Sequence, residues 1–135
     1  VLLVSTPEPS SLTDAYSLLK ALYCNPDFVE EETTIHIVTN RVNCRDEGQA
    51  IYEKVNSVVS KFLHGSLNYL GMIPQDAALE RAVRQQKTVT MSDPNAKSAK
   101  AISCLTDHLL NGTQQKAPVR WGIAQMFSSF LSNRK

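Results

Sequence analysis

The chain has 135 residues, which is the size of a single domain, and 42% of them are hydrophobic while 20% are charged. This composition is typical of a folded globular protein and excludes extensive disorder. A net charge of +1 gives no basic excess of the kind that nucleic-acid binding requires. No apolar run approaches the roughly 20 residues that a membrane-spanning helix needs.

The first part of the chain predicts a strand followed by a helix. Residues 1–5 are a continuous apolar run, typical of a strand buried on both faces. Two prolines follow and end this strand. Ser10 or Ser11 is placed to cap a helix, with Asp14 in a capping-box position. Apolar residues at helical spacing continue that helix as far as an Asn-Pro pair at 25–26.

The middle of the chain repeats this alternation. Residues 34–39 are rich in β-branched side chains and predict a second strand, which the polar segment 40–43 closes. A long amphipathic helix then runs from Asp46 to Gly65. Residues 67–73 predict a third strand, which Pro74 terminates.

The last predicted elements complete an α/β pattern. Asp76 caps a helix, residues 89–91 suggest a short strand, and Pro94 lies near the start of a helix whose apolar stripe is Ile102, Leu105 and Leu109. Strands that alternate with amphipathic helices predict a parallel sheet with helices on both faces.

The chain contains no complete catalytic motif. Its three cysteines are widely spaced and its three histidines are scattered, so we expect free thiols and no metal site. None of the five glycines stands in a phosphate-binding loop pattern. The cysteines are Cys24, Cys44 and Cys104, and the histidines are His36, His64 and His108.

Polar segments follow each of the three main predicted strands. They are Thr6-Pro7-Glu8, Asn40-Arg41 and Pro74-Gln75-Asp76. Open parallel sheets bind ligands beyond the carboxyl ends of their strands, so we expect these segments to share one crevice. Ordinary strand-to-helix turns use the same residue types, and this is the alternative interpretation.

Three long segments carry a resemblance to a known family. They are VLLVSTPEPSSLTDAYSLLK (1–20), IVTNRVNCRDEGQAIYEKV (37–55) and KFLHGSLNYLGMIPQDAALERAVRQQKTV (61–89). The chain resembles the MinD/ParA-type deviant Walker ATPases, and within them the flagellar-number regulators (FlhG/FleN). The resemblance covers about the whole chain, and the TPEPSS-x-TDAY and LGMIPQD segments are its most specific parts.

The resemblance implies the C-terminal half of a P-loop NTPase with a three-layer α/β fold. The family's Walker A loop, switch I and switch II would precede the first strand of this chain. The parent protein would bind ATP or ADP with Mg²⁺, form a homodimer and hydrolyse ATP. A non-catalytic binding module, or part of a related septum-site or chromosome-partitioning ATPase, is the alternative.

The resemblance also implies roles for individual residues. Asn40 matches the position that reads adenine, with Arg41 beside it, and an amide offers both a donor and an acceptor to a purine. The segment Pro74-Gln75-Asp76 matches the loop on the other side of the base. The residues that match the dimer interface are Glu8, Ser10 and Asp14, for which helix capping is the alternative role.

The C-terminal segment predicts a separate amphipathic helix. Residues 1–110 would form the ATPase half, 111–118 a linker and 119–135 the helix, whose apolar residues and cations suit an in-plane membrane anchor. A helix docked on the domain's own core is the alternative. The residues expected to touch lipid are Trp121, Ile123, Met126, Phe127, Phe130 and Leu131.

These features together predict a cytoplasmic protein that associates peripherally with the inner face of the bacterial cell membrane. The expected partners are a second copy of the chain, anionic lipid and, by resemblance, flagellar assembly proteins. In the isolated chain, residues 1–5 would leave an apolar strand edge open, so we expect it to self-associate.

Overall fold

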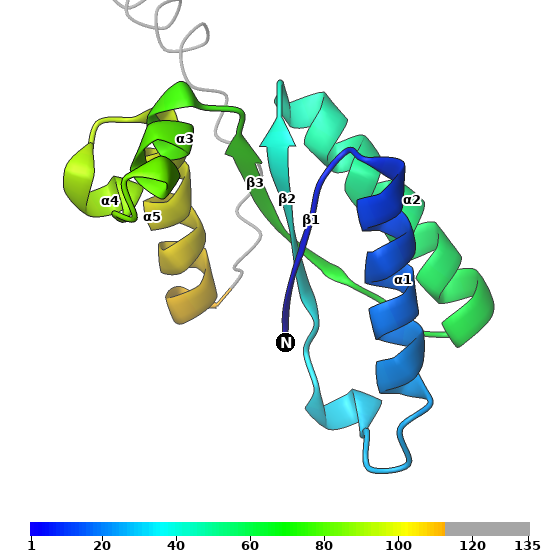
Figure 1. Cartoon of the computed structure of the whole chain (residues 1–135). Coiled ribbons are helices and arrows are strands. Elements are labelled where there is room, and N and C mark those ends of the chain that lie inside the picture. The colour runs from blue at the N-terminus through cyan, green and yellow to red at the C-terminus, as the bar shows by residue number, and fades with distance from the viewer. Residues whose placement is uncertain (113–135) are drawn as a thin grey trace, which may run out of the picture.

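A computed structural model describes residues 1–112, and it builds them around a parallel sheet with the strand order β1-β2-β3 (Figure 1). The strands are β1 (Leu2–Ser5), β2 (His36–Val42) and β3 (Asn68–Pro74). The helices are α1 (Pro9–Tyr23), η1 (Glu30–Glu32), α2 (Arg45–Leu63), α3 (Ala77–Arg84), α4 (Val89–Ser92) and α5 (Lys97–Asn111). The predicted amphipathic segment 119–135 lies outside the described residues.

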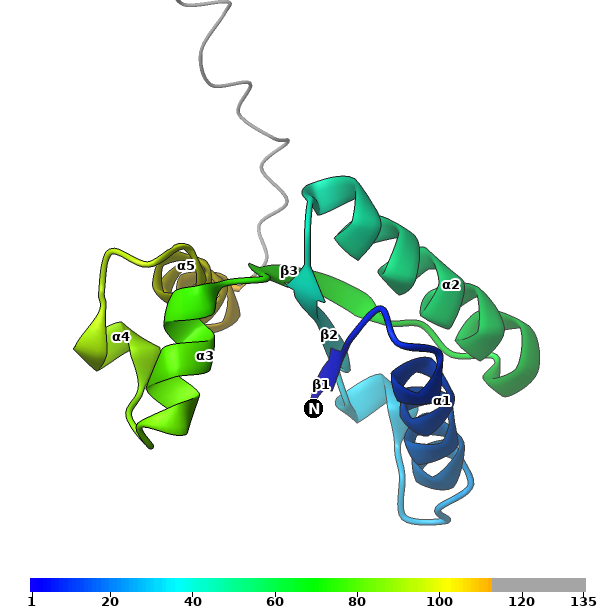
Figure 2. The same ribbon diagram turned by 45° about the horizontal axis from the view of Figure 1, so that its top comes forward.

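Helices cover both faces of the sheet, which confirms the predicted α/β architecture (Figure 2). α1 and α2 pack together on one face, over β1, β2 and part of β3. α5 packs on β3, and a second cluster of buried residues joins α3, α4 and α5. The main core beneath α1 and α2 consists of Leu3, Ala15, Leu19, Ile35, Ile37, Val55, Val59 and Leu67.

Only one face of β1 is buried, so the expectation that this strand is covered on both faces is wrong for residues 1–112. Leu3 and Ser5 point into the core, whereas Leu2 and Val4 are each 51% exposed. The cause is the position of α5, which covers β3 at the other end of the sheet. β1 is also an edge strand in this part of the chain.

β2 and β3 pair with two offsets that cancel. The register shifts by one residue between Ile37 and Val38 and shifts back between Asn40 and Val42. Asn40 and Arg41 therefore belong to the strand, rather than closing it as the sequence suggested. The second offset is a bulge at Arg41, whose backbone is left-handed (φ 60°).

α2 lies unusually close to the sheet at Gly48. A Cβ atom at this position would lie 2.7 Å from both the Thr39 hydroxyl oxygen and the Tyr69 hydroxyl oxygen. Those two hydroxyls are hydrogen-bonded to each other at 3.0 Å. Glycine is therefore the residue that allows the first turn of α2 to cross β2 and β3 at this distance.

Three local predictions need correction. Residues 89–91 belong to a helical turn, because Thr88 O accepts hydrogen bonds from the N–H groups of Met91 and Ser92. α5 begins at Lys97, three residues after Pro94. The cap of α1 is Glu8 and its side chain makes no capping bond, whereas Ser11 Oγ accepts a bond from the N–H of Thr6.

No helix among residues 1–112 has the length and apolar content needed to cross a bilayer.

Candidate functional site

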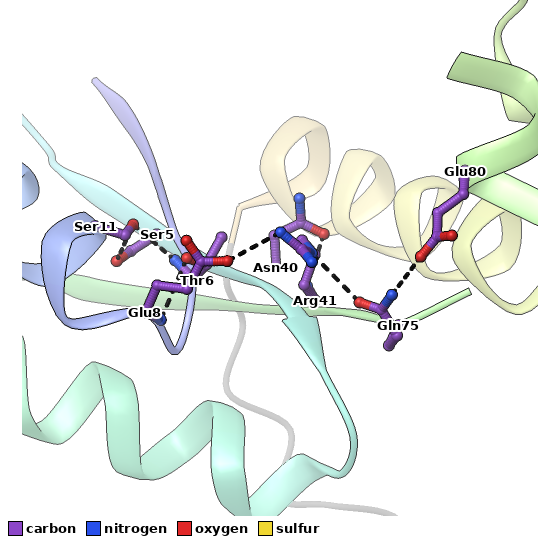
Figure 3. A network of polar contacts seen from close by, with 8 residues as sticks. All are labelled: Ser5, Thr6, Glu8, Ser11, Asn40, Arg41, Gln75 and Glu80. Carbon is purple, nitrogen blue, oxygen red and sulfur yellow. Dashed lines mark hydrogen bonds and ion pairs between the residues drawn. The ribbon is translucent and has the colours of Figure 1, made fainter. Parts of the chain in front are cut away.

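The turns that follow the three strands meet at one rim of the sheet, and Arg41 links them (Figure 3). Its Nη1 donates to Glu8 Oε1 at 3.0 Å, and its Nε donates to Gln75 Oε1 at 3.4 Å. Gln75 in turn donates from Nε2 to Glu80 on α3. The segments after β2 and β3 therefore line one pocket, whereas Thr6-Pro7-Glu8 lies beside it and reaches it only through the Glu8–Arg41 contact, so the expectation of one crevice shared by all three segments is met for two of them.

A pocket of about 420 Å³ opens at this rim, a size that suits a small organic ligand. It is formed by the ends of β2 and β3 and by one side of α3. The five residues expected to surround adenine all line it. Its lining consists of Asn40, Arg41, Pro74, Gln75, Asp76, Leu79, Glu80, Val83 and Arg84.

The amide of Asn40 is oriented by the residue that follows it. Asn40 Oδ1 accepts a hydrogen bond from the backbone N–H of Arg41 at 2.8 Å. Among residues 1–112, no protein group accepts a bond from Asn40 Nδ2. The side chain therefore lines the pocket with a free donor and with the second lone pair of a carbonyl oxygen.

Asp76 is held firmly by backbone groups. Its Oδ1 caps α3 through the N–H of Ala78 at 2.9 Å, which confirms the predicted cap. Its Oδ2 accepts bonds from the N–H and the hydroxyl of Ser98, at 2.9 and 2.8 Å. Hydrogen bonds from Ser98 and Ala78 favour the charged carboxylate and lower the pKa of Asp76. In this arrangement the carboxylate shapes the loop that lines the pocket.

The sequence reasoning missed the apolar wall of the pocket. Leu79 and Val83 are one helical turn apart on α3, and both line the cavity together with Pro74. Val83 is 66% exposed, so this wall is open to solvent at the mouth of the pocket. The signal that could have identified this wall is their i, i+4 spacing directly after the Pro74-Gln75-Asp76 turn.

The residues expected at a dimer interface gather in a second hollow. Glu8, Ser10 and Asp14 line a depression of about 520 Å³ beside the open edge of β1, with apolar side chains around them. None of the three side chains caps α1. The capping alternative is therefore wrong, and an interface role stays a prediction. The apolar neighbours are Leu3, Val4, Ala15 and Leu18.

The side chains at the rim are suited to binding a ligand through apolar contacts and hydrogen bonds. Pro74, Leu79 and Val83 offer apolar surface to the faces of a flat ring, and the amides of Asn40 and Gln75 offer hydrogen bonds to its edge. Within residues 1–112, no three His, Cys, Asp or Glu side chains gather where they could hold a metal ion.

Comparison with curated proteins finds two flagellar relatives, whereas no protein-family model matches the chain. The antiactivator FleN of Pseudomonas aeruginosa is 35% identical over 105 residues, which are 78% of this chain and 36% of FleN. The flagellum site-determining protein YlxH of Helicobacter pylori is 31% identical over 112 residues, 82% of this chain and 36% of YlxH. The chain thus spans little more than a third of the length of these relatives.

Among solved structures, the MinD cell division protein of Aquifex aeolicus has a similar fold. The TM-score is 0.57 and the sequence identity is 18%, over 82% of this chain and 43% of MinD. The parallel sheet and its helices therefore define an α/β segment of the P-loop NTPase type with the MinD fold. The chain is therefore similar in sequence to a segment of FleN and YlxH and similar in fold to MinD.

Proposed function

We propose that this chain is the base-binding part of a MinD-like ATPase that regulates the number or placement of flagella. The pocket would hold the adenine of ATP or ADP, with Asn40 and Gln75 at the edge of the base. The phosphates and Mg²⁺ would be held by a phosphate-binding loop elsewhere in the full-length protein. The flagellar role rests on the similarity to YlxH, a flagellum site-determining protein, and to the antiactivator FleN.

The observation that supports this proposal most directly is the shared pocket. Asn40-Arg41 and Pro74-Gln75-Asp76 come from different strands, yet all five residues line one cavity. A purine has apolar faces and a polar edge, and the cavity offers apolar side chains and amides to match. These side chains could therefore contact the base. Within residues 1–112, no cluster of three His, Cys, Asp or Glu side chains could bind the metal ion.

Replacing Asn40 by Ala in the full-length protein tests the pocket. We expect the Kd for ATP and ADP to rise by about tenfold, because a hydrogen-bonding pair at the base edge is lost. Asn68→Ala is the matched control, since Asn68 is an exposed residue at the opposite end of β3. An unchanged Kd in the Asn40→Ala variant, measured by calorimetry, would contradict the assignment.

We further propose that nucleotide binding drives dimerisation through the hollow that contains Glu8, Ser10 and Asp14. This hollow lies beside the open edge of β1, and Glu8 is bonded to Arg41 at the pocket. The chain contains no phosphate-binding glycine pattern, so we expect no ATP turnover from the chain alone. Turnover by the isolated chain would contradict this division of roles.

Membrane association is the third part of the proposal, and it would place the protein at the inner face of the bacterial membrane. Segment 119–135 would lie in the plane of an anionic bilayer, and a dimer would present two such anchors. We expect Phe127→Glu to reduce ATP-dependent sedimentation with anionic vesicles severalfold. Ser128→Glu adds the same charge on the polar face and is the control. Equal losses in both variants would indicate a charge effect alone.

A further inference from the structure

The positive charges of the described residues are concentrated on α3, α4 and α5. Residues 81–100 contain five lysines and arginines and a single acidic residue, whereas the rest of residues 1–112 contains five cations and twelve acidic residues. Figure 2 shows α3, α4 and α5 grouped on one side of the molecule, with α1 and α2 on the other. We call this surface the basic corner, and its cations are Arg81, Arg84, Lys87, Lys97 and Lys100.

The end of α3 gathers three of these cations. The helix ends in a Schellman motif, in which the N–H of Lys87 donates to Ala82 O at 2.9 Å. Gln86 supplies the left-handed residue that this motif requires (φ 54°). The chain therefore turns back on the helix, and Lys87 lies beside the last turn of α3, which carries Arg81 and Arg84.

The basic corner also carries an apolar side chain that the fold does not use. Met91 on α4 is 83% exposed, the largest value for any large hydrophobic residue among residues 1–112. Its neighbour Val89, in contrast, is buried in the cluster that joins α4 to α3 and α5. The side chains of Arg81 and Lys87 are exposed, and neither forms an ion pair within residues 1–112. Exposed cations together with a protruding apolar side chain are typical of surfaces that contact anionic lipid.

We propose that the basic corner is a second membrane contact, in addition to the C-terminal anchor. Arg81 and Lys87 bind the phosphate groups of anionic lipid, and Met91 enters the headgroup region. This inference rests on the proposed membrane association and determines which side of the domain faces the bilayer. An anionic bilayer is favoured over an acidic protein because the proposed anchor already brings that surface to the chain.

The chain lengths fit this arrangement. α5 begins in the basic corner at Lys97 and its 15 residues extend for about 22 Å. The predicted linker continues for six residues beyond the described part of the chain, 113–118, and six residues can span up to about 20 Å. The linker is therefore long enough to let the predicted anchor and the basic corner reach the same bilayer surface.

Two double variants of the full-length protein test the cations. Arg81→Gln with Lys87→Gln changes the basic corner, and Lys54→Gln with Lys61→Gln removes two exposed cations from α2, on the other side of the molecule. Sedimentation with ATP and vesicles of about 30% phosphatidylglycerol in phosphatidylcholine measures the affinity. Each cation at an anionic surface contributes about fivefold, so we expect the first variant to lose about tenfold or more and the control less than about twofold. Thermal unfolding checks the fold of each variant.

A second pair of variants tests the apolar contact. We expect Met91→Ser to reduce vesicle binding severalfold, because the side chain no longer enters the headgroup region. Phe62→Ser is the control, since Phe62 is 59% exposed on α2. Equal binding by the two serine variants would contradict a contact through Met91.

The outcomes separate this inference from the proposed function. Equal losses in the two double variants would show that net charge alone controls binding, and would overturn the inference. Unchanged binding after Arg81→Gln with Lys87→Gln, while Phe127→Glu still reduces it, would overturn the inference and keep the anchor. An acidic protein would then be the remaining candidate for the basic corner. A wild-type protein that does not sediment with these vesicles would contradict membrane association itself, and this inference with it.

Discussion

Asp76 and Ser98 tie the pocket loop to α5. Asp76 Oδ2 accepts both the N–H and the hydroxyl of Ser98, and Ser98 is fully buried. The other carboxylate oxygen caps α3 at Ala78. One carboxylate therefore fixes the starts of two helices and the turn that lines the pocket.

Replacing Asp76 by Ala should lower the thermal unfolding midpoint by several degrees. The change removes a helix cap and leaves the N–H and hydroxyl of Ser98 without their acceptor. Asp107→Ala is the control, because Asp107 is an exposed acid on α5. Differential scanning calorimetry of the two variants measures the effect, and equal midpoints would show that the carboxylate has no structural role.

The same carboxylate predicts a loss of stability in acid. Its pKa is lower in the folded protein than in the unfolded chain, so its stabilising effect is complete above the unfolded value of about 3.9. That effect is lost as the pH falls through the lower, folded value. We expect the stability difference between wild type and Asp76→Asn to shrink as the pH falls below about 4. A difference that stays constant in urea titrations from pH 6 to pH 2 would refute this.

Gly48→Ala should destabilise the protein by about 1–3 kcal/mol, the usual cost of overpacking. The new methyl group would lie 2.7 Å from the hydroxyl oxygens of Thr39 and Tyr69. Tyr69→Phe removes one of these oxygens and should recover part of the loss in the double variant. Ser60→Ala, on the exposed side of the same helix, should be nearly neutral. Denaturant unfolding compares wild type with these four variants.

The open edge of β1 should make the isolated chain self-associate. Leu2 and Val4 are half-exposed on an edge strand, and such edges pair with other strands unless a charge interrupts them. Val4→Lys should shift the chain toward monomer in sedimentation velocity. Met91→Lys adds the same charge at an exposed apolar residue on α4. If both variants behave alike, net charge rather than the strand edge controls association.

Much of the fold could be predicted from the sequence because the hydrophobic patterns are local. The apolar run at residues 1–5, the helical stripe of α2 and the Asp76 cap each produced the expected element. Residues 89–91 were assigned to a strand because their side chains favour strands, but contacts with α3 and α5 hold them in a helical turn. Such tertiary packing is not visible in a local pattern.

The residues at the strand ends of the candidate site could be predicted from the sequence, but the apolar side chains of α3 that line the pocket could not. The rule that parallel strands end at a common rim located Asn40 and Gln75 correctly. The exposure of Val83 depends on how α3 packs in the folded protein, and the contacts of Arg41 depend on a bulge in β2. Neither of these leaves a signature in the order of residue types.

The two register offsets between β2 and β3 cancel, so the irregular pairing does not displace the buried residues of the sheet. An extra residue enters β3 near Leu70 and is matched by one in β2 at Arg41, so Thr39 and Val42 both stay fully buried. Evolution can therefore exchange side chains at the mouth of the cavity while the interior keeps its packing. A protein engineer has the same freedom to alter ligand preference there without rebuilding the core.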